Sequence, residues 1–96
     1  MERLFQTKQD YIHRKIAQVD VLIGIGDNVA DFNGYITLNE TAAFLWEQMS
    51  APKTVTQLVE ALTGEFAVEQ AQARTDVQQL LEDLLEQNLI REVHDL

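Results

Sequence analysis

One stretch, Asp31–Trp46 (DFNGYITLNETAAFLW), constrains the fold most, because it joins a turn, a strand and a helix without intervening residues. Its Asn33-Gly34 pair is a strong turn signal, since both residues tolerate positive φ. Tyr35–Leu38 is rich in residues that favour β-strands. Asn39 can then cap a helix by accepting a backbone N–H from the first helical turn. This junction predicts strands before it and helices after it.

Two further strands are predicted upstream, and with Tyr35–Leu38 they make a three-stranded antiparallel sheet. Residues 11–17 roughly alternate between apolar and polar, which is typical of a half-exposed edge strand. Residues 20–26 form a clearer apolar strand, and a short turn near Gln18 joins the two strands as a hairpin. Residues 1–10 show no clear period and are predicted to be a flexible arm, or an arm that becomes ordered against a partner.

Apolar residues at spacings of three and four predict three helices downstream, at residues 40–49, 55–63 and 69–87. Thr54 and Gln57 fit a capping box at the start of the second helix. Gly64 is expected just past the end of that helix, and Asn88 is expected to stop the third in the left-handed conformation. Residues 11–93 are therefore predicted to form one α+β domain that is winged-helix-like, with a three-stranded antiparallel sheet followed by a three-helix bundle.

The composition excludes several classes of protein. The chain has no cysteine, which removes a disulfide framework, thiolate nucleophiles and thiolate metal ligands. No apolar run approaches the roughly 18 residues that a membrane span needs. The N-terminus also lacks the apolar segment of a secretory signal. A cytoplasmic protein with no membrane partner is the expectation.

The formal charge of −9 is concentrated in the helical half of the chain. Residues 1–39 contain five acidic and four basic residues, whereas residues 40–96 contain eleven acidic and three basic residues. Nucleic-acid readers need a basic surface to neutralise phosphates. The predicted third helix has Arg74 as its single base against five acids. Nucleic acid is therefore not an expected partner, although a winged-helix DNA-binding regulator remains the alternative hypothesis.

The chain offers little for catalysis. Neither His13 nor His94 has a partner at a recognisable spacing, and both are interpreted as solvated surface residues. The acids near residues 82–86 fit a polar helix face better than a metal site. Gly24-Ile25-Gly26 precedes no helix and so does not predict a phosphate-binding loop. We expect a non-catalytic protein with no cofactor.

Peptide binding is the remaining class. A short third strand at a sheet edge has unpaired backbone groups, to which an extended peptide can add as a further strand. One face of the third helix is apolar at its C-terminal end, through Leu81 and Leu85, and could form the wall of a groove beside that strand. The alternative is that these two leucines belong to the core and that the strand edge is covered.

Several segments resemble the PqqD-like family, the peptide-recognition elements of ribosomally made and post-translationally modified peptides. The similarity covers about residues 10–92. The junction motif is the most specific part. The other matching segments are Thr54–Val59, Phe66–Val68, Asp76–Leu84 and Asn88–Ile90. The chain departs from common family features at the N-terminus of the third helix, where Ala67 and Glu69 make a weak cap, and at Asn88, where many members have Gly.

The resemblance implies that the leader region of a precursor peptide adds as a strand beside the third strand. It also implies delivery of that precursor to a maturation enzyme, often a radical S-adenosylmethionine (radical SAM) enzyme. An uncovered edge strand also permits a homodimer formed by strand or hairpin swapping. Arg74, Arg14 and Lys15 are expected to accommodate the acidic residues that leaders often carry. The implied peptide-binding residues are Tyr35, Ile36, Thr37, Leu38, Arg74, Val77, Gln78, Leu81 and Leu85.

Overall fold

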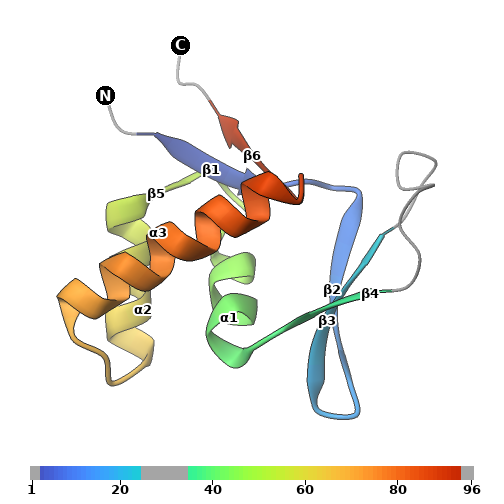
Figure 1. Cartoon of the computed structure of the whole chain (residues 1–96), viewed down its shortest axis with the longest axis horizontal. Helices are drawn as coiled ribbons and strands as arrows, with labels where there is room; N and C mark the ends of the chain where they lie inside the picture. The colour runs from blue at the N-terminus through green and yellow to red at the C-terminus, as the bar shows by residue number, and fades with distance from the viewer. Residues whose placement is uncertain (1–2, 25–34, 94–96) are drawn as a thin grey trace.

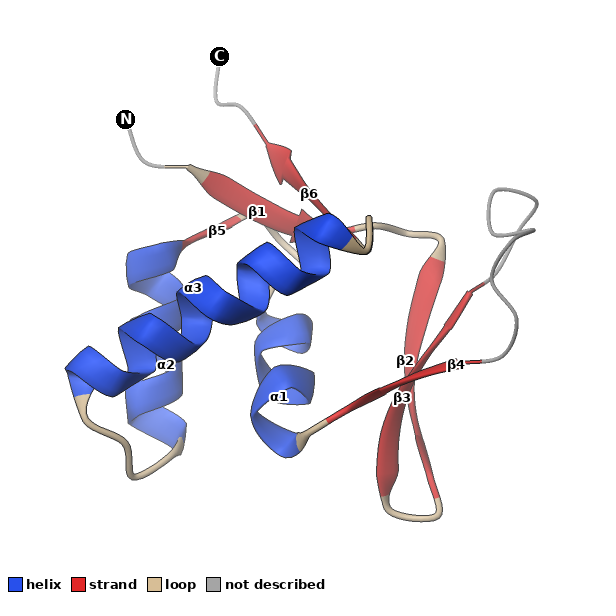
Figure 2. Cartoon of the chain, viewed as in Figure 1, coloured by secondary structure: helices blue, strands red, loops and turns tan. Residues whose placement is uncertain are grey.

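The computed structural model describes residues 3–24 and 35–93, which form two three-stranded sheets and three helices (Figures 1 and 2). The Asn33-Gly34 turn, Ile25 and Gly26, and His94 lie outside the described residues. In chain order the elements are β1 (Leu4–Thr7), β2 (Tyr11–Ile16), β3 (Val19–Gly24), β4 (Tyr35–Leu38), α1 (Glu40–Gln48), β5 (Lys53–Thr54), α2 (Val55–Glu65), α3 (Gln70–Glu86) and β6 (Ile90–Val93).

The predicted antiparallel sheet is confirmed, with strand order β2-β3-β4. Ile16 pairs with Val19, so β2 and β3 are joined by a two-residue turn. Both turn residues have positive φ, 50° at Ala17 and 68° at Gln18. Positive φ at both central residues is typical of a type I′ turn, whose twist matches that of the two strands in a tight hairpin. In the middle of the sheet Leu22 is fully buried and faces the helices.

A second sheet, with strand order β5-β1-β6, was not predicted. It corrects the expectation of a flexible arm over residues 1–10, because residues 4–7 are β1, its central strand. Leu4 pairs with Thr54 on one side and Val93 on the other, and the Phe5 side chain is only 2% exposed in the core. Four residues without a clear period give no local signal, and their strand conformation depends on partners far along the chain.

The helices follow their predicted starts closely. The Thr54 hydroxyl accepts from the Gln57 N–H at 3.1 Å, and the Gln57 side chain accepts from the Thr54 N–H at 2.9 Å, so the capping box is confirmed. Asn88 has φ 63° after the end of α3, which confirms the predicted left-handed stop. The prediction for Gly64 is wrong, because α2 runs to Glu65 and includes it.

One continuous core joins the helices to both sheets. Trp46 is 4% exposed and belongs to this core, as expected from the stripe of α1. α1 contacts all three strands of the β2-β3-β4 sheet, and α2 packs against both α1 and α3. Figure 1 shows the β2-β3-β4 sheet on one side of α1, with the rest of the helical layer on the other. α1 is therefore the element that holds this sheet on the bundle.

Candidate functional site

The strand Tyr35–Leu38 forms as predicted and lies at an edge of its sheet. Within the described residues β4 pairs with β3 alone. Ile36 and Leu38 pack against the core, while Thr37 is exposed on the other face. The strand is therefore anchored by its side chains, and the backbone groups on its far side have no strand partner among the described residues.

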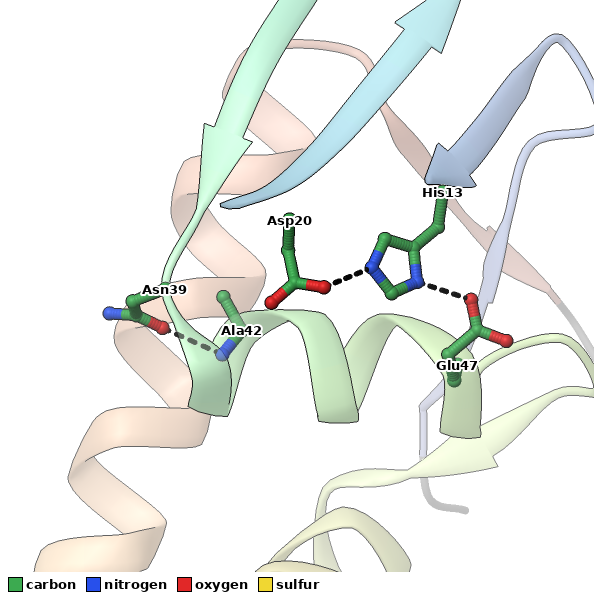
Figure 3. Close-up of polar contacts among 5 residues, drawn as sticks. All are labelled: His13, Asp20, Asn39, Ala42 and Glu47. Carbon is green, nitrogen blue, oxygen red and sulfur yellow. Dashed lines mark hydrogen bonds and ion pairs between the residues drawn. The ribbon is translucent and has the colours of Figure 1, made fainter. Parts of the chain in front are cut away.

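Asn39 links this strand directly to α1. Its side-chain oxygen accepts the Ala42 N–H at 2.7 Å, and its backbone carbonyl accepts the Ala43 N–H at 2.9 Å (Figure 3). The residue is extended, with φ −75° and ψ 172°, so the chain passes from strand to helix without a loop. The cap sets the direction in which β4 leaves the helix.

A hollow of about 320 Å³ begins at Asn39, next to the end of β4, and lies between α1 and α3. We call it the α1–α3 hollow. Leu45 and Leu80 contribute apolar surface from the two helices, and Asp76 and Asp83 contribute carboxylates from α3. The complete lining is Asn39, Thr41, Ala42, Leu45, Asp76, Gln79, Leu80 and Asp83.

The α3 residues predicted to bind the peptide do not line the α1–α3 hollow. Val77 is fully buried and Leu81 is 4% exposed, so both belong to the core. Leu81 also lines, with Gln78 and Leu85, a separate hollow of about 280 Å³ between α3 and β1. We call it the β1–α3 hollow, and its other lining residues are Arg3, Phe5, Val55 and Glu82. Arg74 is exposed and lines neither of these two hollows.

The predicted strand and the predicted helix face are thus not brought together in one hollow. The flank of α3 that meets the junction carries Asp76, Leu80 and Asp83 instead. Helical spacing identifies both flanks as amphipathic but cannot say which one faces β4, because that depends on how α3 packs on α1 and α2. Leu80 reads as part of the core stripe from spacing alone, whereas it is half-buried at the border of the hollow.

His13 is the polar residue that the sequence interpretation missed. It lies on the core side of β2, with its side chain 17% exposed, and is not a solvated surface histidine. Its Nε2 lies 2.8 Å from Asp20 Oδ1 on β3, and its Nδ1 lies 2.8 Å from Glu47 Oε2 on α1 (Figure 3). A carboxylate only accepts hydrogen bonds, so both contacts are satisfied when both ring nitrogens carry a proton.

The environment of His13 favours that charged form. Burial lowers the pKa of His13, but the hydrogen bonds and charges of Asp20 and Glu47 outweigh burial and raise the pKa above its ordinary value. The imidazolium therefore links both strands of the hairpin to α1. The two carboxylates contact opposite ring nitrogens and do not converge on one point, and no group of residues in the described part of the chain is placed to hold a metal ion.

Comparison with known proteins identifies the family. The family model described as coenzyme PQQ synthesis protein D (PqqD) matches residues 20–90. The chain belongs to the PqqD family. The matched range includes the junction and all three helices, so the resemblance seen in the sequence is confirmed for this PqqD-family protein. No curated protein sequence matches the chain.

Two solved structures share the fold of this PqqD-family chain. One is described as TbiB1 in complex with the TbiA(beta) leader peptide; it has a TM-score of 0.72 and 18% identity, over 94% of this chain and 99% of that one. The other is described as lasso peptide synthetase B1 complexed with the leader peptide; it has a TM-score of 0.71 and 22% identity, over 91% and 96% of the two chains. At these identities the likeness concerns the fold.

In the described range no helix is long and apolar enough to cross a membrane. The ring nitrogens of His13 are both engaged by carboxylates. A general base needs a free nitrogen within reach of a proton. His13 therefore has a structural role in this arrangement.

Proposed function

We propose that this protein is a non-catalytic peptide chaperone that binds the leader region of a ribosomally synthesised precursor peptide. The leader adds as a strand to β4, and its side chains enter the α1–α3 hollow. The observation that carries the proposal is the edge of β4, which has no strand partner among the described residues and lies next to that hollow. Membership of the PqqD family supports it, as do two solved structures of the same fold that contain leader peptides.

Strand addition suits the way β4 is held. The peptide supplies backbone donors and acceptors to groups that lack a strand partner among the described residues, and alternate peptide side chains point to one face. Ile36 and Leu38 are already packed against the core, so they need not move to admit the peptide. A preformed edge lowers the cost of ordering the site on binding.

The α3 part of the predicted site changes in this proposal. Val77 and Leu81 support the core, and the wall of the site consists of Leu80 with the two aspartates beside it. The charge of α3 also argues against the DNA-binding alternative. Its exposed surface carries one base, Arg74, and four acids: Asp76, Glu82, Asp83 and Glu86. Such a helix repels phosphates.

The maturation enzyme is the second partner, and we propose that it is a radical SAM enzyme, as the family resemblance implies. The test is to reconstitute the modification with the enzyme and precursor encoded beside this gene, with and without this protein. We expect modification of the precursor to slow markedly in its absence. Equal rates in both reactions would remove the delivery role but leave leader binding intact.

The binding proposal is tested by titrating the ¹⁵N-labelled protein with the synthetic leader of the neighbouring precursor. We expect the largest amide shifts at Tyr35–Leu38 and around Leu80. The variant Thr37→Pro removes an edge donor and should weaken binding at least about tenfold. Lys15→Pro is the matched control, because the two-residue turn after Ile16 leaves the Lys15 N–H on the outer side of β2, at the opposite edge of the sheet. Both variants are first checked for folding by their spectra.

A second experiment uses the wild-type protein and changes the leader instead. Each backbone nitrogen of the leader is methylated in turn, which removes one N–H at a time. An added strand directs alternate N–H groups to β4, so every second methylation should weaken binding. Uniform losses across the methylated leaders would rule out addition at β4. So would a loss of binding with Lys15→Pro and not with Thr37→Pro.

A further inference from the structure

The α1–α3 hollow has a definite charge. Asp76 and Asp83 both line it, and its lining includes no basic side chain. Each carboxylate accepts only a neutral amide in the described part of the chain: Gln72 bonds to Asp76 at 2.8 Å, and Gln79 to Asp83 at 3.2 Å. Both aspartates are exposed, so a ligand can reach them. The hollow therefore presents two carboxylates without a cationic partner among the described residues.

An apolar contact point lies between the two carboxylates. Leu80 is half-buried and falls between Asp76 and Asp83 along α3. Leu45 and Ala42 of α1 line the same hollow. Asp83 follows Asp76 by seven residues, which is about 10 Å along the axis at the helical rise per residue. Figure 1 shows α3 and β4 sloping in the same direction across the view, and a strand added to β4 would follow the slope of β4.

We propose that this hollow selects a leader segment of the pattern basic–x–aliphatic–x–basic. This inference rests on the proposed function. Alternate residues of a strand share a face and lie about 6.6 Å apart, so the outer two of three such residues are about 13 Å apart. This separation is about 3 Å longer than the distance between Asp76 and Asp83 along α3, and flexible Lys or Arg side chains can span the difference. The central aliphatic side chain then contacts Leu80.

The bases expected to accommodate an acidic leader do not face this hollow. Arg74 is exposed outside it, and Arg14 lies on the outer face of the sheet, opposite to the face of Leu22. Lys15 lines a different hollow that also contains Asp20 and Glu40. An acidic segment would therefore meet like charges at the site, whereas a basic one gains two ion pairs.

The experiment is a selection of random 12-residue displayed peptides on the immobilised wild-type protein and on the Asp76→Asn/Asp83→Asn variant. The control is Glu82→Gln/Glu86→Gln, which removes the same charge from exposed positions of α3 outside this hollow. Because the whole chain is acidic, it attracts basic peptides in general, and only the control separates that effect from the hollow.

We expect wild-type and control selections to yield Lys or Arg two positions on either side of an aliphatic residue, and the aspartate variant to lose this pattern. A synthesised wild-type binder should bind the aspartate variant about tenfold more weakly, with less salt dependence, since each exposed pair contributes modestly. Binders that shift Tyr35–Leu38 but lack the pattern, or tolerate the aspartate variant, would overturn this inference and leave the proposed function standing. If no binder perturbs β4, both fall.

Discussion

The two sheets of this protein are held in different ways. The β5-β1-β6 sheet joins three segments from the beginning, middle and end of the chain, and its Phe5 is in the core. The β2-β3-β4 sheet comes from one stretch of chain, rests on α1 and keeps β4 at its edge. The difference indicates that the first sheet closes the fold. In the proposed function the second sheet provides the binding edge.

The largest expected effect tests the closing role. Phe5→Ala removes a nearly fully buried ring from β1 and should cost about 3–5 kcal/mol in the free energy of unfolding. Ile16→Ala, at the tip of the other sheet, should cost much less, because Ile16 is 52% exposed. Chemical denaturation of both variants measures the difference.

Because Phe5→Ala removes a large part of the stability of a small domain, Phe5→Leu is the milder companion and should cost less than Phe5→Ala. Equal losses for Phe5→Leu and Ile16→Ala would contradict the assignment of β1 to the closing sheet. Leader binding of folded Phe5→Leu should match the wild type, because Phe5 does not line the α1–α3 hollow.

The difference between the sheets also explains what could be predicted from sequence. The hairpin, the third strand and the Asn39 cap have local signals, because turn residues, alternation and capping act over a few neighbouring positions. β1 has no such signal. Phe5 and its neighbours become a strand only because residues 53–54 and 90–93 approach from far along the chain.

The candidate site could likewise be predicted only where its sequence signals are local. Tyr35–Leu38 is found from its own composition, and the edge position holds within the described residues. In the proposed site the α3 wall lies on the neighbouring flank, since Leu80 and Leu81 are adjacent in sequence but only Leu80 lines the α1–α3 hollow. The His13 contacts likewise join residues from three elements, and the spacing of these residues in the sequence does not predict the contacts.

The second effect concerns how the β2-β3-β4 sheet is fastened to α1. His13 has a folded-state pKa above its value of about 6.5 in an unfolded chain. Its stabilising contribution is therefore complete below about pH 6.5 and is lost as the pH rises through the folded-state pKa. A charged hydrogen bond is worth about 1.5–3 kcal/mol, and Asp20 should supply most of it because Glu47 is 59% exposed and screened.

Thermal unfolding between pH 5 and pH 9 measures this contribution. The wild type should lose stability over the upper part of that range, and His13→Gln should remove that loss. His94→Gln replaces the other histidine and should retain the wild-type profile. A profile unchanged by His13→Gln would show that the sheet is fastened by its apolar contacts alone.

A smaller effect separates stability from binding at two helix caps. Asn39→Ala and Thr54→Ala each remove a side-chain cap, and each should cost about 1 kcal/mol in unfolding free energy. Asn39 lines the α1–α3 hollow and follows β4, whereas Thr54 belongs to the closing sheet. Only Asn39→Ala should weaken leader binding, which calorimetric titration of both variants would measure. Equal binding losses would mean that the effect comes from general destabilisation.

The smallest effect has the opposite sign and tests the same separation. Gly64 lies inside α2 and does not line the α1–α3 hollow, and a Cβ at this position meets no atom within 4 Å. Gly64→Ala should therefore stabilise the fold by about 0.5–1 kcal/mol, because glycine loses more chain entropy in a helix. A glycine past the helix end would have given a loss instead. Thermal unfolding decides the sign, and leader affinity should stay unchanged, since stability added in α2 alters neither β4 nor the wall that Leu80 provides.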